Sequence, residues 1–275
     1  MSDETRMPVA LTVAGFDPSG GAGIVADVKT FTAFGCFAAA AVTSLTYQNT
    51  TGVFGAAHQT AETVRAQVLA VAEDFRVAGA KTGMLPTREI IREVARLFNE
   101  TSLPAPVVDP VVRSTSGFDL IDDEALDALK RELLPLARVV TPNLPEAERL
   151  TGLRVRDREG MLEAARAMRE LGARAVLVKG GHLAGDAFDL LLDEDGRVRT
   201  FTVARVETDS THGTGCTLAA AIAACLARGL NLEESVAAAK RFVTEAIRRA
   251  PGLGRGHGPV NHAVAATFRE SFLKP

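Results

Sequence analysis

Short apolar runs alternate with longer amphipathic stretches along most of this chain. Runs of about four to eight β-branched or apolar residues are typical of buried strands, and apolar positions roughly three or four residues apart are typical of helices. The alternation predicts strand–helix–strand units, and therefore an α/β fold with a central, mostly parallel sheet covered by helices on both faces. The expected strands are 9–14, 39–45, 53–56, 78–82, 106–109, 138–141, 173–178, 187–192 and 198–203, and the clearest helices are 24–34, 61–74, 88–98, 214–228 and 232–249.

Cap and turn residues mark where other elements begin and end. Asp122 or Asp123 suits the first position of a helix whose leucines share one face up to residue 133. A second apolar stripe, 161–171, is followed by Gly172, the residue type that ends many helices. Residues 195–196, Asp-Gly, separate two predicted strands in the way a tight hairpin turn does.

The balance of hydrophobic and charged positions limits the domain organisation. Of the 275 residues, 47% are hydrophobic and 24% are charged, which is enough for one large core. No internal repeat, low-complexity tract or linker interrupts the pattern. We therefore expect a single domain over residues 1–275, with residues 1–8 as a flexible N-terminus.

Charge and cysteine usage argue against several classes of function. The net charge of −3 comes from 31 basic and 34 acidic residues mixed along the chain, which disfavours a nucleic-acid or anionic-membrane partner. Cys36, Cys216 and Cys225 lack the spacing of a zinc site or a disulfide framework. No apolar segment reaches the roughly 20 residues that cross a bilayer, and the N-terminus has no apolar run of signal length. We expect a cytoplasmic protein.

The strongest candidate for chemistry is the segment from Thr211 to Thr217, directly before an alanine-rich helix. Glycines there let successive N–H groups point at one place, and the helix N-terminus adds partial positive charge, which favours a bound anion. Cys216 falls in the first turn, where its thiol pKa is expected to be lowered, as suits a base that accepts a hydroxyl proton. The alternative is a tight turn into a buried helix, with Cys216 as a small core residue.

A second glycine-rich segment, from Asp17 to Gly23, follows the first predicted strand. Backbone approaches ligands closely in such turns, but the segment lacks the dinucleotide fingerprint and the lysine of a P-loop. An ordinary strand-to-helix turn is the alternative. The nearby carboxylates of Asp17 and Asp27 favour a ligand site only slightly.

Polar residues follow three later strands, at the edge where open α/β sheets bind ligands. Asp109 and Glu146 could hold Mg²⁺ there, partly through water, although each could equally cap a helix or lie in solvent. Lys179 could meet a nucleotide phosphate or stand in a solvated turn. No metal is assigned to four histidines, because their spacing is not that of ligands: His58, His212, His257 and His262.

Taken together and in order, these segments resemble the hydroxymethylpyrimidine-phosphate kinases of the ribokinase-like superfamily. The resemblance runs from about residue 9 to about residue 262, and ten ordered matches are far more specific than any one motif. The matching pieces are 11–15 with 17–23, 26–30, 48–50, 81–85, 108–111, 116–117, 140–146, 179–182, 212–217 and 257–260.

The resemblance implies a ribokinase-like fold, usually as a homodimer, and an acceptor site for a small pyrimidine. It further implies transfer of the ATP γ-phosphoryl group to the pyrimidine hydroxymethyl, and then to the monophosphate. By position, Gln48 resembles the residue whose amide pairs with the aminopyrimidine. Gly15, Asp27 and Met84 correspond to neighbours of that pocket.

The remaining matches correspond to the phosphate-transfer half of such a site. Cys216 matches the proposed base of the family, and Asp109 and Glu146 match the acidic groups near Mg²⁺. Two further sets are implied, an anion hole and an ATP-binding region: Gly213, Thr214 and Gly215 for the first, and Lys179, Asn143 and Thr211 for the second.

Three residues depart from the pattern of the family. Phe16 replaces a small hydroxyl residue and Val25 a glutamine beside the substrate turn, so the acceptor could also be pyridoxal. Arg113 replaces an apolar residue and either contacts phosphate or lies in solvent. The leading hypothesis is the bifunctional pyrimidine kinase, favoured by Gln48. The alternatives are a pyridoxal kinase and a ligand-sensing regulator without catalysis, which the intact anion segment and Cys216 disfavour.

Overall fold

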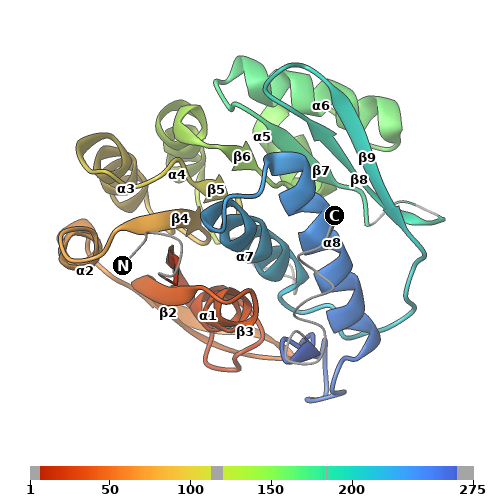
Figure 1. The fold of residues 1–275 in the computed structure, drawn as a ribbon, viewed down its shortest axis with the longest axis horizontal. Helices are drawn as coiled ribbons and strands as arrows, with labels where there is room; N and C mark the ends of the chain where they lie inside the picture. Colours follow the sequence, from red (N-terminus) through yellow and green to blue (C-terminus); the bar gives the residue numbers. More distant parts are fainter. Residues whose placement is uncertain (1–6, 113–119, 182, 184, 265–275) are drawn as a thin grey trace.

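The computed structural model describes residues 7–112, 120–181, 183 and 185–264. Nine strands within them form one sheet in the order β3-β2-β1-β4-β5-β6-β7-β8-β9 (Figure 1). The strands are β1 (Val9–Phe16), β2 (Phe37–Asn49), β3 (Gly52–His58), β4 (Val77–Thr82), β5 (Val107–Val108), β6 (Val139–Val140), β7 (Val176–Lys179), β8 (Ala187–Leu192) and β9 (Val198–Val203). The helices are α1 (Gly23–Ala33), α2 (Ala61–Ala72), α3 (Arg88–Glu100), α4 (Asp123–Ala128), α5 (Leu144–Thr151), α6 (Arg158–Glu170), α7 (Thr214–Ala227) and α8 (Leu232–Arg248).

The six strands in the middle of this order run parallel. β1 pairs with β2 and β4, and β5, β6 and β7 continue the parallel ladder. Antiparallel strands complete both ends, β3 beside β2, and β8 and β9 beside β7. The carboxyl ends of the parallel strands therefore meet at one edge of the sheet, where ligands bind in open α/β folds.

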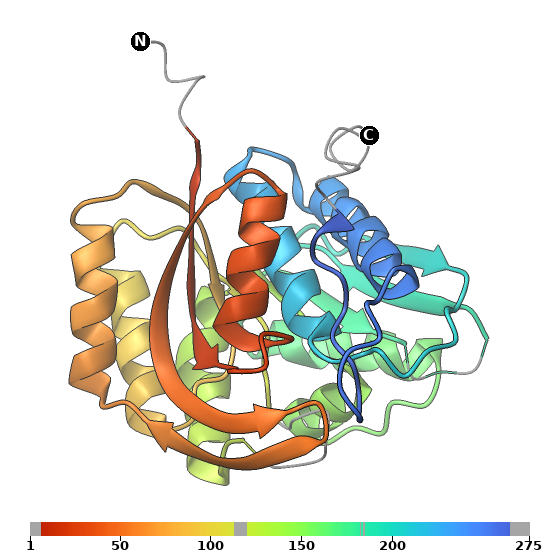
Figure 2. The ribbon, with the colours of Figure 1, turned by 90° about the horizontal axis from the view of Figure 1, so that it is seen from below.

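Helices cover the two faces of the sheet in two groups (Figures 1 and 2). α1, α7 and α8 lie on one face around Phe31 and Phe242, and α2 to α6 lie on the other around Leu133, Met161 and Met168. α7 is packed against the sheet, α1 and α8, which explains why its sequence is apolar on nearly every side. In the described part of the chain, no helix combines the length and the apolarity needed to cross a bilayer.

The expected mostly parallel sheet with helices on both faces is confirmed, and three elements differ from the expectation. β2 continues to Asn49 and forms with β3 a long curved hairpin (Figure 2). α5 begins at Leu144, where the expected elements included no helix, because Asn143 caps it and a proline stands in its first turn. The helix expected up to residue 133 changes after Ala128 into a π-helical turn, Leu129–Leu133, whose leucines are still buried.

Caps and turns predicted from single residues are confirmed. The N–H of Ala125 donates to the side chain of Asp122 at 2.8 Å, so Asp122 caps α4. Gly172 and Gly196 both have positive φ, +106° and +81°, as their turns require. Other expectations lie outside the described residues: residues 1–6 of the N-terminus, Arg113, residues 116–117 and His182.

Candidate active site

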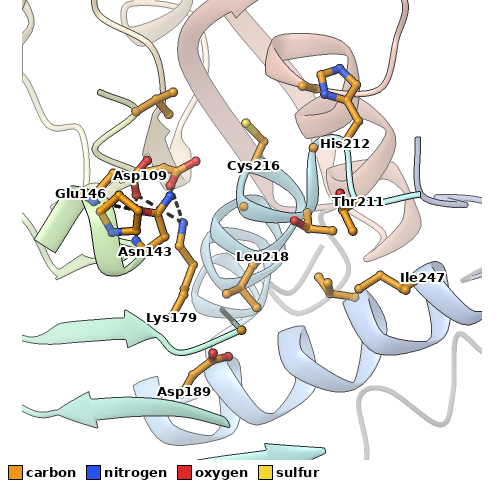
Figure 3. Close-up of a pocket in the computed structure, with 18 of the residues that line it drawn as sticks. Asp109, Asn143, Glu146, Lys179, Asp189, Thr211, His212, Cys216, Leu218 and Ile247 are labelled. Carbon is orange, nitrogen blue, oxygen red and sulfur yellow. Dashed lines mark hydrogen bonds and ion pairs between the residues drawn. The ribbon is translucent and has the colours of Figure 1, made fainter. Parts of the chain in front are cut away.

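A cleft of about 1040 Å³ opens at the carboxyl edge of the sheet. Its walls come from the turn after β1, the β2–β3 hairpin, the loops after β5, β6 and β7, and from α7 and α8 (Figure 3). The cleft brings together nearly all of the predicted site residues: Gly15, Gln48, Met84, Asp109, Asn143, Glu146, Lys179, Thr211, Gly213, Thr214, Gly215 and Cys216. Of the predicted set, Asp27 alone does not line it.

The turn before α7 forms one wall of the cleft. Gly213 has φ +79°, and a Cβ at this position would lie 1.8 Å from the carbonyl oxygen of Gly21, so no other residue fits. A Cβ on Gly215 would lie 3.1 Å from Lys179 Nζ, which places this backbone close to the ammonium. The first N–H groups of a helix have no partner within the helix and carry partial positive charge. The geometry is the one that an anion hole requires.

Cys216 stands on the first turn of α7 and is half-buried (Figure 3). Burial raises the pKa of its thiol to about 12, against the effect of the nearby Lys81 ammonium, and the Asp109 and Asp27 carboxylates add to the rise. The lowered thiol pKa expected from the helix N-terminus is therefore wrong, because loss of solvation outweighs the Lys81 ammonium and the hydrogen bond from the Gly23 backbone, which act to lower it.

Two buried carboxylates and one ammonium meet after β5, β6 and β7. Asp109 and Glu146 are 2% and 5% exposed. Lys179 Nζ lies 3.1 Å from Asp109 Oδ1 and 3.9 Å from Glu146 Oε2 (Figure 3). Burial raises the pKa of Glu146 to about 7, although Lys179 acts to lower it. Burial acts to lower the pKa of Lys179, but the two carboxylates outweigh it and raise that pKa, so the ammonium stays charged.

Glu146 also belongs to the N-terminal cap of α5. Its Oε2 accepts a hydrogen bond from the N–H of Asn143 at 2.8 Å, and Asn143 Oδ1 accepts one from the N–H of Glu146 at 2.9 Å. The sequence left open whether Glu146 caps a helix or faces a site, and one side chain does both. An asparagine with a glutamate three residues later was a readable signal for this helix.

The carboxylates of Asp109 and Glu146 fit a Mg²⁺ ion that is held partly by the protein and partly by substrate phosphates. Among the residues that the structure describes, no group of three His, Cys, Asp or Glu side chains could enclose a metal ion. Mg²⁺ usually keeps several waters and takes about one or two carboxylates together with phosphates, which Asp109 and Glu146 can supply. The Lys179 ammonium already places one positive charge beside both carboxylates.

One side of the cleft is built by β1, β2 and the loop after β4. Gln48 lies on the part of β2 that extends into the hairpin, and its amide offers a donor and an acceptor. A Cβ on Gly15 would lie 3.1 Å from the sulfur of Met84, so glycine leaves room for this side chain. Phe16 and Val25 both depart from the family pattern, but only Phe16 lines the cleft. Of the two, Phe16 is therefore the one that can change the shape of the cleft wall.

Asp27 lies beneath this wall and not on it. Its carboxylate is fully buried, and its Oδ2 accepts hydrogen bonds from Thr12 Oγ1 at 2.7 Å and Lys81 Nζ at 2.8 Å. Lys81 lines the cleft, whereas sequence reasoning used it only as the start of a matching segment. Asp27 therefore does not line the cleft itself but supports Lys81, which does, and its role as a neighbour of the substrate pocket stays a prediction.

The far end of the cleft is apolar and contains one buried ion pair. Asp189 of β8 is 3% exposed and lies 2.6 Å from Lys240 Nζ on α8. Sequence reasoning missed both residues, although an aspartate inside the apolar run 187–192 was a signal. The apolar lining comes from both sides of this end, with Leu218 and Ile247 seen in Figure 3: Val203, Val206, Leu218, Val243 and Ile247.

Residues 17–261 match the model of a family described as phosphomethylpyrimidine kinase. The chain belongs to this family. A hydroxymethylpyrimidine/phosphomethylpyrimidine kinase of Haemophilus influenzae is 44% identical over 92% of this chain and 95% of the relative. A thiamine biosynthesis bifunctional protein, ThiED, of Geobacter sulfurreducens is 51% identical over 93% of this chain, and the chain spans only 52% of that longer protein.

The phosphomethylpyrimidine kinase family is the one expected from the ordered motifs, so that expectation is confirmed. The matched range contains every cleft residue except Gly15 and Phe16. Among solved structures, a Bacillus subtilis pyridoxal kinase in an ADP complex has a TM-score of 0.88 at 37% identity, over 95% of this chain and 100% of that chain. This likeness confirms the expected ribokinase-like fold.

Proposed function

We propose that this chain transfers the γ-phosphoryl group of ATP to the hydroxymethyl group of 4-amino-5-hydroxymethyl-2-methylpyrimidine, and then to the monophosphate, in thiamine biosynthesis. One observation carries the proposal: a single cleft holds Gln48 on its acceptor side, the N-terminus of α7, and an apolar end beside Asp189 and Lys240. The family and the name of the Haemophilus influenzae relative support the reaction. The ADP complex of the pyridoxal kinase supports the binding of an adenine nucleotide, and we place it at the apolar end, where its base can be buried.

The residues divide the work between positioning and charge. Gln48 pairs with the aminopyrimidine, and the N–H groups from Gly213 to Cys216 hold the phosphoryl group in transfer. Lys179, with Asn143 beside it, faces the nucleotide phosphates, and Thr211 contributes from the other side of α7 in the same cleft (Figure 3). Such transfer depends mostly on holding the reactants in line and stabilising charge on the phosphoryl oxygens.

Cys216, in its thiolate form, takes the proton of the acceptor hydroxyl in this proposal. The thiol of Cys216 is protonated at neutral pH, because burial raises its pKa to about 12. The Lys81 ammonium acts in the opposite direction and favours the thiolate. Transfer of a phosphoryl group passes through a loose transition state in most analyses, so the hydroxyl need not lose its proton early. A small thiolate population is compatible with such a reaction.

Mg²⁺ is proposed as the metal of the reaction. When bound, it would neutralise charge on the ATP phosphates. Asp109 and Glu146 would hold it through oxygen atoms and water. Because Lys179 already contacts both carboxylates, it would share their charge with the metal.

A pyridoxal acceptor is the second candidate, because Phe16 lines the acceptor wall and a pyridoxal kinase has this fold. The test is a parallel assay of hydroxymethylpyrimidine, its monophosphate and pyridoxal with MgATP. We expect both pyrimidines to be phosphorylated well above pyridoxal. Gln48→Leu should raise KM for the pyrimidines and leave KM for ATP unchanged. Pyridoxal as the best acceptor, or no ATP consumption with any of the three, contradicts the proposal.

A homodimer is proposed on the basis of the β2–β3 face. Large apolar side chains are exposed there, which is unusual for a surface in contact with water only. These residues are Phe37, Leu45, Tyr47 and Phe54. Sedimentation of the wild type and of Phe54→Lys tests it, since the substitution should shift the chain towards a monomer. A cytoplasmic location stays a prediction from the sequence.

A further inference from the structure

The carboxylate of Asp17 joins two glycine-rich turns that are far apart in the chain. It is 1% exposed and accepts hydrogen bonds within its own turn from the N–H of Ser19 and the N–H of Ala22, both at 2.8 Å. The Ser19 hydroxyl also donates to it. Its Oδ2 lies 2.8 Å from Nε2 of His212, in the turn before α7. Since an ionised carboxylate only accepts, Nε2 of His212 carries the proton.

The two turns also touch through their backbones. A Cβ on Gly21 would lie 2.5 Å from the imidazole of His212, and a Cβ on Gly213 would overlap the carbonyl of Gly21. A third segment also holds His212, because the backbone N–H of His212 donates to the carbonyl of Gly258 at 3.1 Å. Gly258 belongs to the matching segment 257–260, to which the resemblance assigns no function. These close contacts therefore allow only one packing of the Asp17 turn against the His212 turn.

Each turn contributes to the same cleft. Gly23, at the end of the first turn, and Gly213, which follows His212, both line it. The first turn lies on the acceptor side, and the second leads into the helix N-terminus that faces the phosphoryl group. Burial acts to raise the pKa of Asp17, but hydrogen bonds from His212 and Ser19 hold it below its ordinary value, so the carboxylate is ionised. An ionised acceptor strengthens these hydrogen bonds.

We propose that Asp17 and His212 are a positioning pair that sets the acceptor turn at the right distance from the anion-binding turn. This inference rests on the proposed phosphoryl transfer. The hydrogen bond between them spans 195 residues of sequence and fixes the two halves of the site to each other. Misplacement of reacting groups by about 1 Å costs roughly 100-fold in rate, so loss of the pair should reduce kcat while each substrate still binds.

His212→Leu removes the donor, and His212→Gln keeps an amide N–H that can reach Asp17. We expect His212→Leu to lower kcat by about 100-fold with KM for ATP within about threefold, and His212→Gln to recover at least about tenfold of the loss. Asp17→Asn with His212→Leu should be no worse than the poorer single variant, because either single change already removes the hydrogen bond between the two side chains. His257→Leu makes the same change at an exposed histidine outside the cleft, and should keep the wild-type rate.

Amide hydrogen exchange supplies a readout that needs no substrate. In His212→Leu, the N–H groups of Ser19 and Ala22 should exchange faster, while those of α3 on the other face stay protected. The positioning pair is overturned if His212→Leu has the kcat of the wild type and unchanged amide exchange at Ser19 and Ala22. It is also overturned if the losses of kcat in the two single variants add in the double variant. If the wild-type chain phosphorylates no acceptor, the proposed function is wrong and the positioning pair is tested separately. Amide exchange at Ser19 and Ala22 then shows whether the contact between Asp17 and His212 holds the two turns together. If His212→Leu does not fold, His212→Gln and Asp17→Asn carry the same comparison.

Discussion

Replacing Lys81 by methionine should leave the carboxylate of Asp27 buried without its counter-ion. Both side chains are fully buried, and Lys81 Nζ lies 2.8 Å from Asp27 Oδ2. Burial raises the pKa of Asp27 although Lys81 and Thr12 act to lower it, so its charge depends on the Lys81 ammonium. Burial alone would lower the pKa of Lys81, but Asp27 raises it above its ordinary value, so the ammonium is charged in the folded protein. At an effective dielectric constant of about 20, two charges at this separation attract by about 6 kcal/mol.

The expected loss of stability is smaller than this attraction, because folding also removes both charges from water. Breaking a buried pair by deleting one partner costs about 3–5 kcal/mol, mostly for the charge that stays behind. Methionine is close in length to the lysine stem, so little cavity is added. Lys81→Met should therefore lower the free energy of unfolding by about 3–5 kcal/mol at neutral pH, measured by urea titration.

A double variant separates the cost of the orphaned charge from the loss of the pair itself. Lys81→Met with Asp27→Leu should recover most of the stability, because apolar replacements of a buried pair are often neutral. Thr12 then loses its acceptor, which costs about 1 kcal/mol, and adding Thr12→Val should remove that cost. As a control, Arg131→Met breaks an exposed pair with Asp127 and should change stability by less than about 0.5 kcal/mol.

The reasoning is refuted if Lys81→Met loses less than about 1 kcal/mol, or if the double variant is as unstable as the single one. The first result would mean that Asp27 is not held as a buried charge. The second would mean that Lys81 contributes through packing, since an apolar pair would then fail to replace it. Equal urea slopes for all variants are required for the comparison, because a changed slope indicates a changed unfolded or folded state.

Two further predictions concern Cys216 and His262. Cys216→Ala should lower kcat by at least about 100-fold while the Kd of the pyrimidine, measured by calorimetry, changes little, and a variant with the wild-type rate would remove the thiol from the mechanism. Burial lowers the pKa of His262 from 6.5 to about 4, and Lys29 adds to the shift. The unfolded chain binds this proton first as pH falls, so stability should decrease between about pH 6.5 and pH 4, by up to about 3 kcal/mol. His262→Gln should flatten that part of the stability curve; an unchanged curve contradicts the assignment.

Local patterns predicted the fold because parallel strands and amphipathic helices have strong periodicities. The α5 helix was missed since it is short, although Asn143 and Glu146 form a capping box at its start. The extension of β2 was missed because its last residues, including Gln48, are stabilised by pairing with β3 and not by an apolar run. The β2 error lies where tertiary contacts outweigh local preference, whereas the α5 error left a local capping signal unused.

The sequence by itself determined the family, the strand and helix order, and most of the residues that line the cleft, because these depend on motifs that keep their order along the chain. Only the tertiary structure decided what those residues do to one another. Burial reversed the expected pKa shift of Cys216, and packing placed Asp27 beneath the cleft, where it pairs with Lys81. The contact between Asp17 and His212 likewise exists only in the folded chain. Solvation and distance between remote residues are properties of packing, and no local pattern contains them.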